Sequence, residues 1–217
     1  MKFLSLNCVI LMVLLSIISI AGCEQEEPIN KEAVVLVRNS SASTSEQSSG
    51  FIISSDGLIL TFLNDRLNVK QLEVVFQDGR ILPASILDKE SSELPYLLMG
   101  EAEVLPGLAY IKVDVANLTP LPSGIENREL RLKEGDPVIM AGYGVDGYIE
   151  IEAEVLSMNF NLPMVSTRVA MLSTPCEPLM EGGPVVNKVG QVVGIILNFR
   201  SGFEQGYMIP LDLIQPY

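Results

Sequence analysis

The chain has 217 residues, of which 14 are basic, 27 are acidic and none is histidine. Imidazole most often accepts and returns protons near neutral pH, so its absence excludes a Ser-His-Asp or Cys-His mechanism and any histidine metal site. The formal net charge of −13 excludes nucleic acid as a partner, because affinity for phosphate backbones depends on Lys and Arg. With 48% hydrophobic and 19% charged residues, the composition is that of an ordinary globular protein. We expect the protein to bind no metal and no cofactor.

Residues 1–22 have the layout of a secretory signal peptide: one lysine, an apolar run from Val9 to Ile20, and then small residues. The apolar run is short for a membrane-spanning helix. The segment from Ile20 to Cys23 (IAGC) resembles a bacterial lipoprotein box, which implies that Cys23 is lipidated and becomes the first residue of the mature chain. The alternative is an ordinary signal peptide followed by a chance cysteine. We expect export and a lipid anchor on Cys23 in a bacterial membrane, with the body facing the periplasm or the cell surface.

The mature chain is predicted to begin with a lipidated tether over residues 23–32, which is polar and contains Pro28. Cys8 would leave with the signal peptide and Cys23 would carry lipid, so Cys176 would have no cysteine to pair with. We interpret Cys176 as a small buried hydrophobic residue, with a reactive thiol as the alternative.

Short apolar runs alternate with turn signals from Ala33 onward, and each run has the length and the β-branched content of a strand. No segment has the periodicity of an amphipathic helix, so the sequence predicts an all-β sandwich or barrel. The predicted strands cover residues 33–37, 51–54, 58–63, 72–76, 81–87, 108–113, 137–143, 148–158, 166–172, 183–187, 191–199 and 206–211.

The connections between these runs carry their own signals. Ser55-Asp56-Gly57, Gln77-Asp78-Gly79 and Lys188-Val189-Gly190 are typical of hairpin turns. The serine-rich stretch Ser40–Ser49 is predicted to be a long mobile loop. Pro120, Pro122 and Gly124 mark a crossing between two halves over Leu118–Lys133.

The order of motifs resembles the HtrA/Deg group of trypsin-like serine proteases over residues 33 to about 215. Each piece alone would be weak, but the ordered set is specific. The matching motifs are Ser49–Thr61 (SGFIISSDGLILT), Val74–Arg80 (VVFQDGR), Leu108–Asp114 (LAYIKVD), Lys133–Val138 (KEGDPV), Gly182–Asn187 (GGPVVN), Gly190–Ile195 (GQVVGI) and Gly206–Pro210 (GYMIP).

This resemblance implies a trypsin-like fold of two six-stranded β-barrels with a cleft between them. We expect residues 33–120 to form the N-terminal barrel and residues 121–217 the C-terminal barrel. Because the chain ends soon after the last predicted strand, we expect no PDZ domain.

The resemblance also shows where the family's catalytic triad would lie, and all three positions are substituted. Asn64 stands at the position of the general base, Gly107 at that of the orienting aspartate, and Glu181 at that of the nucleophilic serine. A second register would put Glu93 at the aspartate position. We therefore expect no catalytic residues here.

The loop that donates amides to the oxyanion in this family corresponds to Leu179, Met180, Gly182 and Gly183. Leu179 replaces a family glycine and disfavours positive φ there, so this loop is predicted to be degenerate. Gly182-Gly183-Pro184 is interpreted as a backbone-packing motif. For Glu181 two readings stay open: a carboxylate folded onto the loop amides, and a solvated side chain at the cleft rim.

These observations predict a catalytically inactive, membrane-anchored homologue of the proteases that binds or scaffolds a protein or peptide in the cell envelope. Two alternatives stay open. One is a serine endopeptidase that acts through unconventional residues, and the other is a purely structural lipoprotein.

Overall fold

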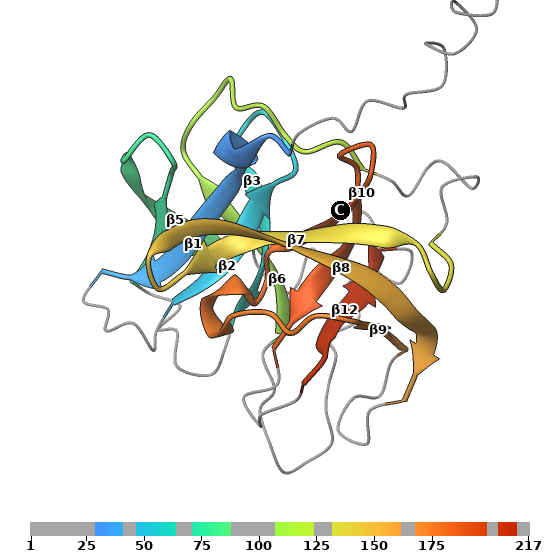
Figure 1. Ribbon diagram of the computed structural model, residues 1–217. Helices are drawn as coiled ribbons and strands as arrows, with labels where there is room; N and C mark the ends of the chain where they lie inside the picture. The colour runs from blue at the N-terminus through green and yellow to red at the C-terminus, as the bar shows by residue number, and fades with distance from the viewer. Residues whose placement is uncertain are drawn as a thin grey trace, which may run out of the picture.

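Twelve strands form the regular structure of the described part of the chain, together with two single-turn 3-10 helices. The structure is a computed structural model that describes residues 29–40, 47–63, 71–87, 107–123, 132–161, 168–198 and 204–211. Figure 1 shows the strands as two barrels that lie side by side, the first coloured blue to green and the second yellow to red. This confirms the prediction of an all-β double barrel.

The first barrel closes in the strand order β1-β2-β3-β6-β5-β4, with every neighbouring pair antiparallel. A 3-10 helix, η1 (Lys31–Ala33), leads into it. Its strands are β1 (Val34–Asn39), β2 (Gln47–Ile52), β3 (Leu58–Leu63), β4 (Leu72–Val75), β5 (Ile81–Ile86) and β6 (Gly107–Val113).

The second barrel closes in the equivalent order, β10-β11-β12-β9-β8-β7. A second 3-10 helix, η4 (Pro178–Met180), precedes β10. The strands are β7 (Pro137–Gly144), β8 (Gly147–Phe160), β9 (Val169–Leu172), β10 (Pro184–Asn187), β11 (Val192–Leu197) and β12 (Gly206–Pro210). Each of the twelve runs predicted from the sequence therefore overlaps one of these strands, although β1 and β2 extend beyond their predicted bounds.

Glycines make the three predicted hairpin turns. Gly57, Gly79 and Gly190 have φ values of 95°, 86° and 74°, in the left-handed region that a side chain disfavours. They connect β2 to β3, β4 to β5 and β10 to β11. The hairpin prediction is confirmed at all three.

The segment between the barrels is held by both of them. The amide of Leu121 donates to the carbonyl of Ile52 (3.1 Å), and the amide of Val192 donates to the carbonyl of Pro122 (2.9 Å). Residues 124–131 of the predicted crossing lie outside the described residues.

Side chains along β8 alternate between the core and solvent, as its sequence predicts. Ala153 and Val155 are buried, whereas Glu150, Glu152 and Glu154 are exposed. The second barrel encloses one apolar cluster, built around Met140, Leu172, Met180, Ile196 and Met208.

A larger apolar cluster joins the two barrels. It includes Val35 and Phe51 of the first barrel and Val186 and Tyr207 of the second, all nearly inaccessible to solvent. The two barrels therefore share an apolar core.

The prediction of a loop over Ser40–Ser49 was wrong at its C-terminal end. Gln47–Ser49 belongs to β2 and pairs with β1, and both Ser48 and Ser49 are fully buried. A serine-rich stretch can enter a core when each hydroxyl finds a partner there. Residues 41–46 lie outside the described residues.

Candidate functional site

Ser49 connects the first barrel to two elements of the second. Its hydroxyl donates to the carbonyl of Leu179 (2.7 Å) and accepts from the amide of Tyr143 (2.8 Å). Its amide donates to the carbonyl of Glu181 (2.8 Å), and its own carbonyl accepts from the hydroxyl of Thr61 (2.6 Å). Both capacities of the Ser49 hydroxyl are thus used in holding the barrels together.

The loop before β10 turns through a 3-10 helix and then a left-handed glycine. Pro178 starts η4, where its fixed φ suits the first position, and the amide of Met180 donates to the carbonyl of Glu177 (3.0 Å). Gly182 has φ +82° and provides the positive φ of this turn.

Gly182 and Gly183 also allow close approach of backbones, Gly182 between the two barrels and Gly183 within the second barrel. A Cβ on Gly182 would lie 2.5 Å from the amide nitrogen of Phe62 and 2.5 Å from the carbonyl oxygen of Ser49. A Cβ on Gly183 would lie 2.2 Å from the carbonyl oxygen of Ala141. These contacts agree with the interpretation of the Gly182-Gly183-Pro184 motif as backbone packing.

Glu181 is buried, with 4% of its surface exposed. The reading of Glu181 as a solvated rim residue was therefore wrong. The amides of Gly182 and Gly183 donate to the carbonyls of Ile196 (3.0 Å) and Met180 (2.9 Å). These two loop amides, like that of Met180, are thus engaged with main-chain carbonyls.

Cys176 lies just before this loop and packs against the apolar cluster of the second barrel. Burial, with a smaller contribution from the negative charge of Glu181, raises the pKa of its thiol to about 12. A thiol with this pKa is protonated at neutral pH and is a poor nucleophile. The interpretation of Cys176 as a small hydrophobic residue fits this environment.

Of the triad positions predicted from the resemblance, Gly107 lies at the start of β6. It pairs with Leu63, the last residue of β3. Asn64 follows Leu63 directly but lies outside the described residues, as does Glu93 of the alternative register. Cys23 and residues 1–28 also lie outside them.

Sequence reasoning missed the residues that hold this region together. Ser49 and Thr61 lay within a recognised motif, yet the sequence gave no sign that the Ser49 hydroxyl binds the second barrel or that the Thr61 hydroxyl donates to the carbonyl of Ser49. Glu177 was missed as well: its carboxylate accepts from the amide of Val145 at the tip of the β7–β8 hairpin (3.4 Å). Ser49 and Leu179 are 130 residues apart in the sequence. A contact at such a separation leaves no pattern in the residues around either partner.

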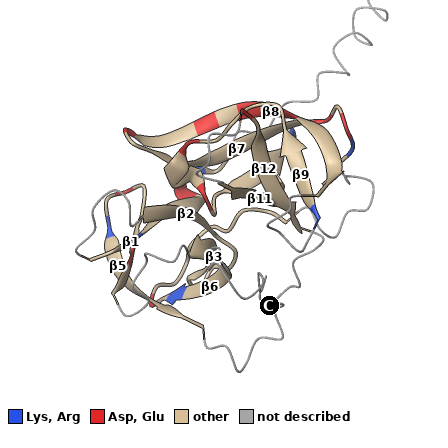
Figure 2. Ribbon diagram, turned by 90° about the horizontal axis from the view of Figure 1, so that it is seen from below, with Lys and Arg blue, Asp and Glu red and all other residues tan. Residues whose placement is uncertain are grey.

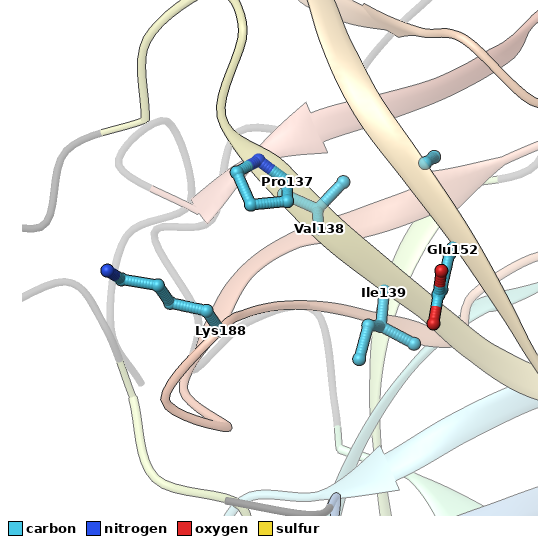
Figure 3. Close-up of a pocket in the computed structure, with 6 residues that line it drawn as sticks. Pro137, Val138, Ile139, Glu152 and Lys188 are labelled. Atoms are coloured by element: carbon cyan, nitrogen blue, oxygen red, sulfur yellow. The ribbon is translucent and has the colours of Figure 1, made fainter. Parts of the chain in front are cut away.

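The pocket in Figure 3 lies away from this loop, on the outside of the second barrel. Its volume is about 290 Å³, and Glu152 of β8 and Lys188 of the β10–β11 turn lie at its two sides. The remaining lining residues are Pro137, Val138, Ile139 and Ala153.

The described residues offer neither a metal-binding group nor a helix that could span a membrane. They contain no group of three or more Cys, Asp and Glu side chains placed to hold a metal ion. Within the same residues, no helix has the length and apolarity needed to cross a membrane.

A family model described as "Trypsin-like peptidase domain" matches residues 48–195, which include β2, the Glu181 loop and β10. The chain belongs to the trypsin-like peptidase domain family. The solved structure of the serine endoprotease from Yersinia pestis supports the same fold, with a TM-score of 0.64 and 26% identity over 84% of this chain and 60% of that one.

Curated relatives within this trypsin-like family include proteases named DegP-like. A probable periplasmic serine endoprotease DegP-like of Halomonas elongata is 30% identical over 76% of this chain and 33% of its own length. A protein of the same name from Pseudomonas putida is also 30% identical, over 76% of this chain and 32% of its own length. The chain thus spans about a third of the length of these relatives. The resemblance to HtrA/Deg-type proteases is confirmed.

Proposed function

We propose that this member of the trypsin-like family is a non-catalytic protein that binds a peptide or protein partner in the bacterial envelope. The observation that carries the proposal is the buried Glu181, which stands where the family's Gly-Asn-Ser-Gly-Gly-Pro motif has its nucleophilic serine. A carboxylate at this position has no hydroxyl whose deprotonation would produce the attacking oxygen of a serine protease. The chain also contains no histidine to act as the general base in such a step.

The other nucleophilic groups near this loop are poorly suited to replace the serine. The Ser49 hydroxyl is buried and bonded on both its donor and acceptor sides. The Thr61 hydroxyl donates to a carbonyl within the first barrel. The Cys176 thiol has its pKa raised to about 12 by burial. None of these three groups therefore supports the alternative of a peptidase acting through unconventional residues.

A binding role is compatible with the loss of the triad. An extended peptide can add to a sheet through main-chain hydrogen bonds, which need no catalytic side chain. The shared core and the Ser49 bonds keep the two barrels in one arrangement, as a preformed cleft requires. The step from fold to binding is by analogy with the family.

Two observations support the proposal that the protein is exported and anchored to a bacterial membrane. The relatives from Halomonas elongata and Pseudomonas putida are named as periplasmic, which supports export. The lipoprotein-like ending at Cys23 supports an anchor, because a protein that carries several acyl chains binds membranes stably. In this proposal a Cys23→Ser variant leaves the membrane fraction, whereas a Cys176→Ser variant stays in it.

A reactive-serine phosphonate probe tests the absence of catalysis. We expect no labelling of the purified chain under conditions in which an active DegP-like protease is fully labelled. A heat-denatured sample of the chain controls for non-specific attachment. Labelling of a serine in the folded chain, lost on denaturation, would replace this proposal with the unconventional peptidase.

A further inference from the structure

The hairpin of β7 and β8 leaves one strand edge unpaired. β8 is 14 residues long, but β7 pairs with it over residues 147–154, and β9 pairs with it over residues 155–160. Among the described strands, none pairs with the first part of β8 on the side away from β7. In Figure 2 this part of β8 runs along the upper border of the second barrel.

The hydrogen bonds farther along β8 show which backbone groups face that side. The carbonyl of Glu154 accepts from the amide of Ser173 (2.9 Å), and the carbonyl of Glu152 accepts from the hydroxyl of Thr174 (3.0 Å). In an antiparallel ladder alternate residues direct their N–H and C=O groups to the same side. The backbone groups of Tyr148 and Glu150, and the amide of Glu152, therefore face the unpaired side.

The side chains along this edge carry one sign of charge. Glu150, Glu152 and Glu154 are exposed at every second position, and the residues opposite them on β7 are Ala141, Ile139 and Pro137. β7 contains no Lys or Arg side chain that could neutralise these carboxylates. Figure 2 shows the acidic positions as red segments along β8.

This charge pattern decides which strand can pair with the edge. A second copy of the chain would place carboxylates against carboxylates, and like charges on neighbouring strands destabilise a pair. A strand with Lys or Arg at alternate positions would place opposite charges there instead. The charges thus oppose self-association, a common protection of strand edges, and favour a basic partner.

We propose that the edge of β8 over residues 148–152 binds an extended basic peptide segment by strand addition, with Glu150 and Glu152 facing its Lys or Arg side chains. The residues of this surface are distinct from the Glu181 loop. Either proposal can therefore fail without the other.

Fluorescence anisotropy with a labelled peptide of alternating Lys and Val tests the proposal on the full purified chain. We expect saturable binding to the wild type and at least about tenfold weaker binding by the double variant Glu150→Lys and Glu152→Lys, because the charges would then repel. A matched control, Asp114→Lys with Glu134→Lys, makes the same change in net charge at exposed positions outside residues 148–152 and should bind within about threefold of the wild type.

A second peptide separates strand addition from simple charge attraction. N-methylation of the amides that face β8 removes hydrogen-bond donors but leaves every charge in place, so we expect it to abolish binding. Equal binding of the methylated peptide, equal loss in both double variants, or no binding of the Lys-Val peptide to the wild type would each overturn the proposal. A dimer in sedimentation equilibrium that dissociates in the Glu150→Lys and Glu152→Lys variant would overturn it too, in favour of a second copy.

Discussion

Ser49 forms hydrogen bonds between the two barrels that no sequence motif predicts. Its hydroxyl joins the carbonyl of Leu179 to the amide of Tyr143, and its main chain joins Glu181 to Thr61. A buried hydroxyl in this position leaves two unsatisfied polar groups when it is removed, and each such group is costly.

Replacement of Ser49 by alanine should therefore lower the free energy of unfolding by about 1–3 kcal/mol. The matched control is Ser48→Ala on the same strand, where the buried hydroxyl has one long contact of 3.4 Å to Thr61. We expect a loss below about 1 kcal/mol for that control, since less is disrupted. Urea denaturation of both variants measures the difference, and equal losses would contradict the role given to Ser49.

Cys176 leads to a prediction about pH. Burial raises the pKa of its thiol to about 12 in the folded chain, above the ordinary value of 9.0. The protonated Cys176 thiol makes its full contribution to the free energy of unfolding below the pKa of the unfolded chain, because the thiol keeps its proton there in both the folded and the unfolded state. This contribution is lost as the pH rises from about 9 toward 12, because only the unfolded thiol ionises there.

A variant that lacks residues 1–22 and carries Cys23→Ser isolates this thiol. At pH near 8 we expect a thiol reagent to modify folded Cys176 at least about a hundredfold more slowly than the urea-unfolded chain. Unfolding at several pH values should show a steeper alkaline loss of stability in this chain than in its Cys176→Ser derivative. Rapid labelling of the folded state would show a reactive thiol instead.

At the scale of elements, the turn before β10 depends on the absence of a Cβ at Gly182. Gly182 and Gly79 have similar φ values, +82° and +86°, but a Cβ on Gly79 meets nothing within 4 Å. The two glycines therefore form a matched pair that separates backbone strain from steric contact.

We expect Gly79→Ala to lower the free energy of unfolding by about 1–2 kcal/mol, the cost of a left-handed residue with a side chain. Gly182→Ala should cost about 2–5 kcal/mol, because the contacts with Phe62 and Ser49 add to that strain. Denaturant unfolding of both variants measures the two losses in the free energy of unfolding. If Gly182→Ala is the milder change, the close packing described here is wrong.

The strands could be predicted from the sequence, but the interactions between the barrels could not. Period-two alternation is local, which is why β8 and its acidic face followed directly from the order of residues. Ser48 and Ser49 were assigned to a loop because the stretch is polar, and the burial of Ser49 becomes understandable only through distant partners such as Leu179. The same holds for Glu181: a motif placed it at the serine position, but its burial depends on the packing of both barrels.

At the scale of the whole molecule, the shared apolar cluster couples the barrels. Residues of both barrels, such as Val35 and Tyr207, belong to one cluster, so neither barrel can open without exposing it. We therefore expect the two barrels to unfold in one cooperative transition.

Hydrogen exchange with mass spectrometry in increasing urea can follow each barrel separately. Peptides from residues 47–63 report on the first barrel, and peptides from residues 184–198 report on the second. Their unfolding midpoints should coincide. Two separate midpoints would mean that the shared cluster does not couple the barrels.

The central claim, that this trypsin-like chain does not catalyse peptide cleavage, is tested most directly by turnover of casein. The measurement uses the purified chain and its Glu181→Ser variant, with an active DegP-like protease as reference. We expect no cleavage by either form, because restoring a serine hydroxyl supplies no imidazole to activate it. Sustained cleavage by the wild-type chain that follows its concentration through purification would contradict the account.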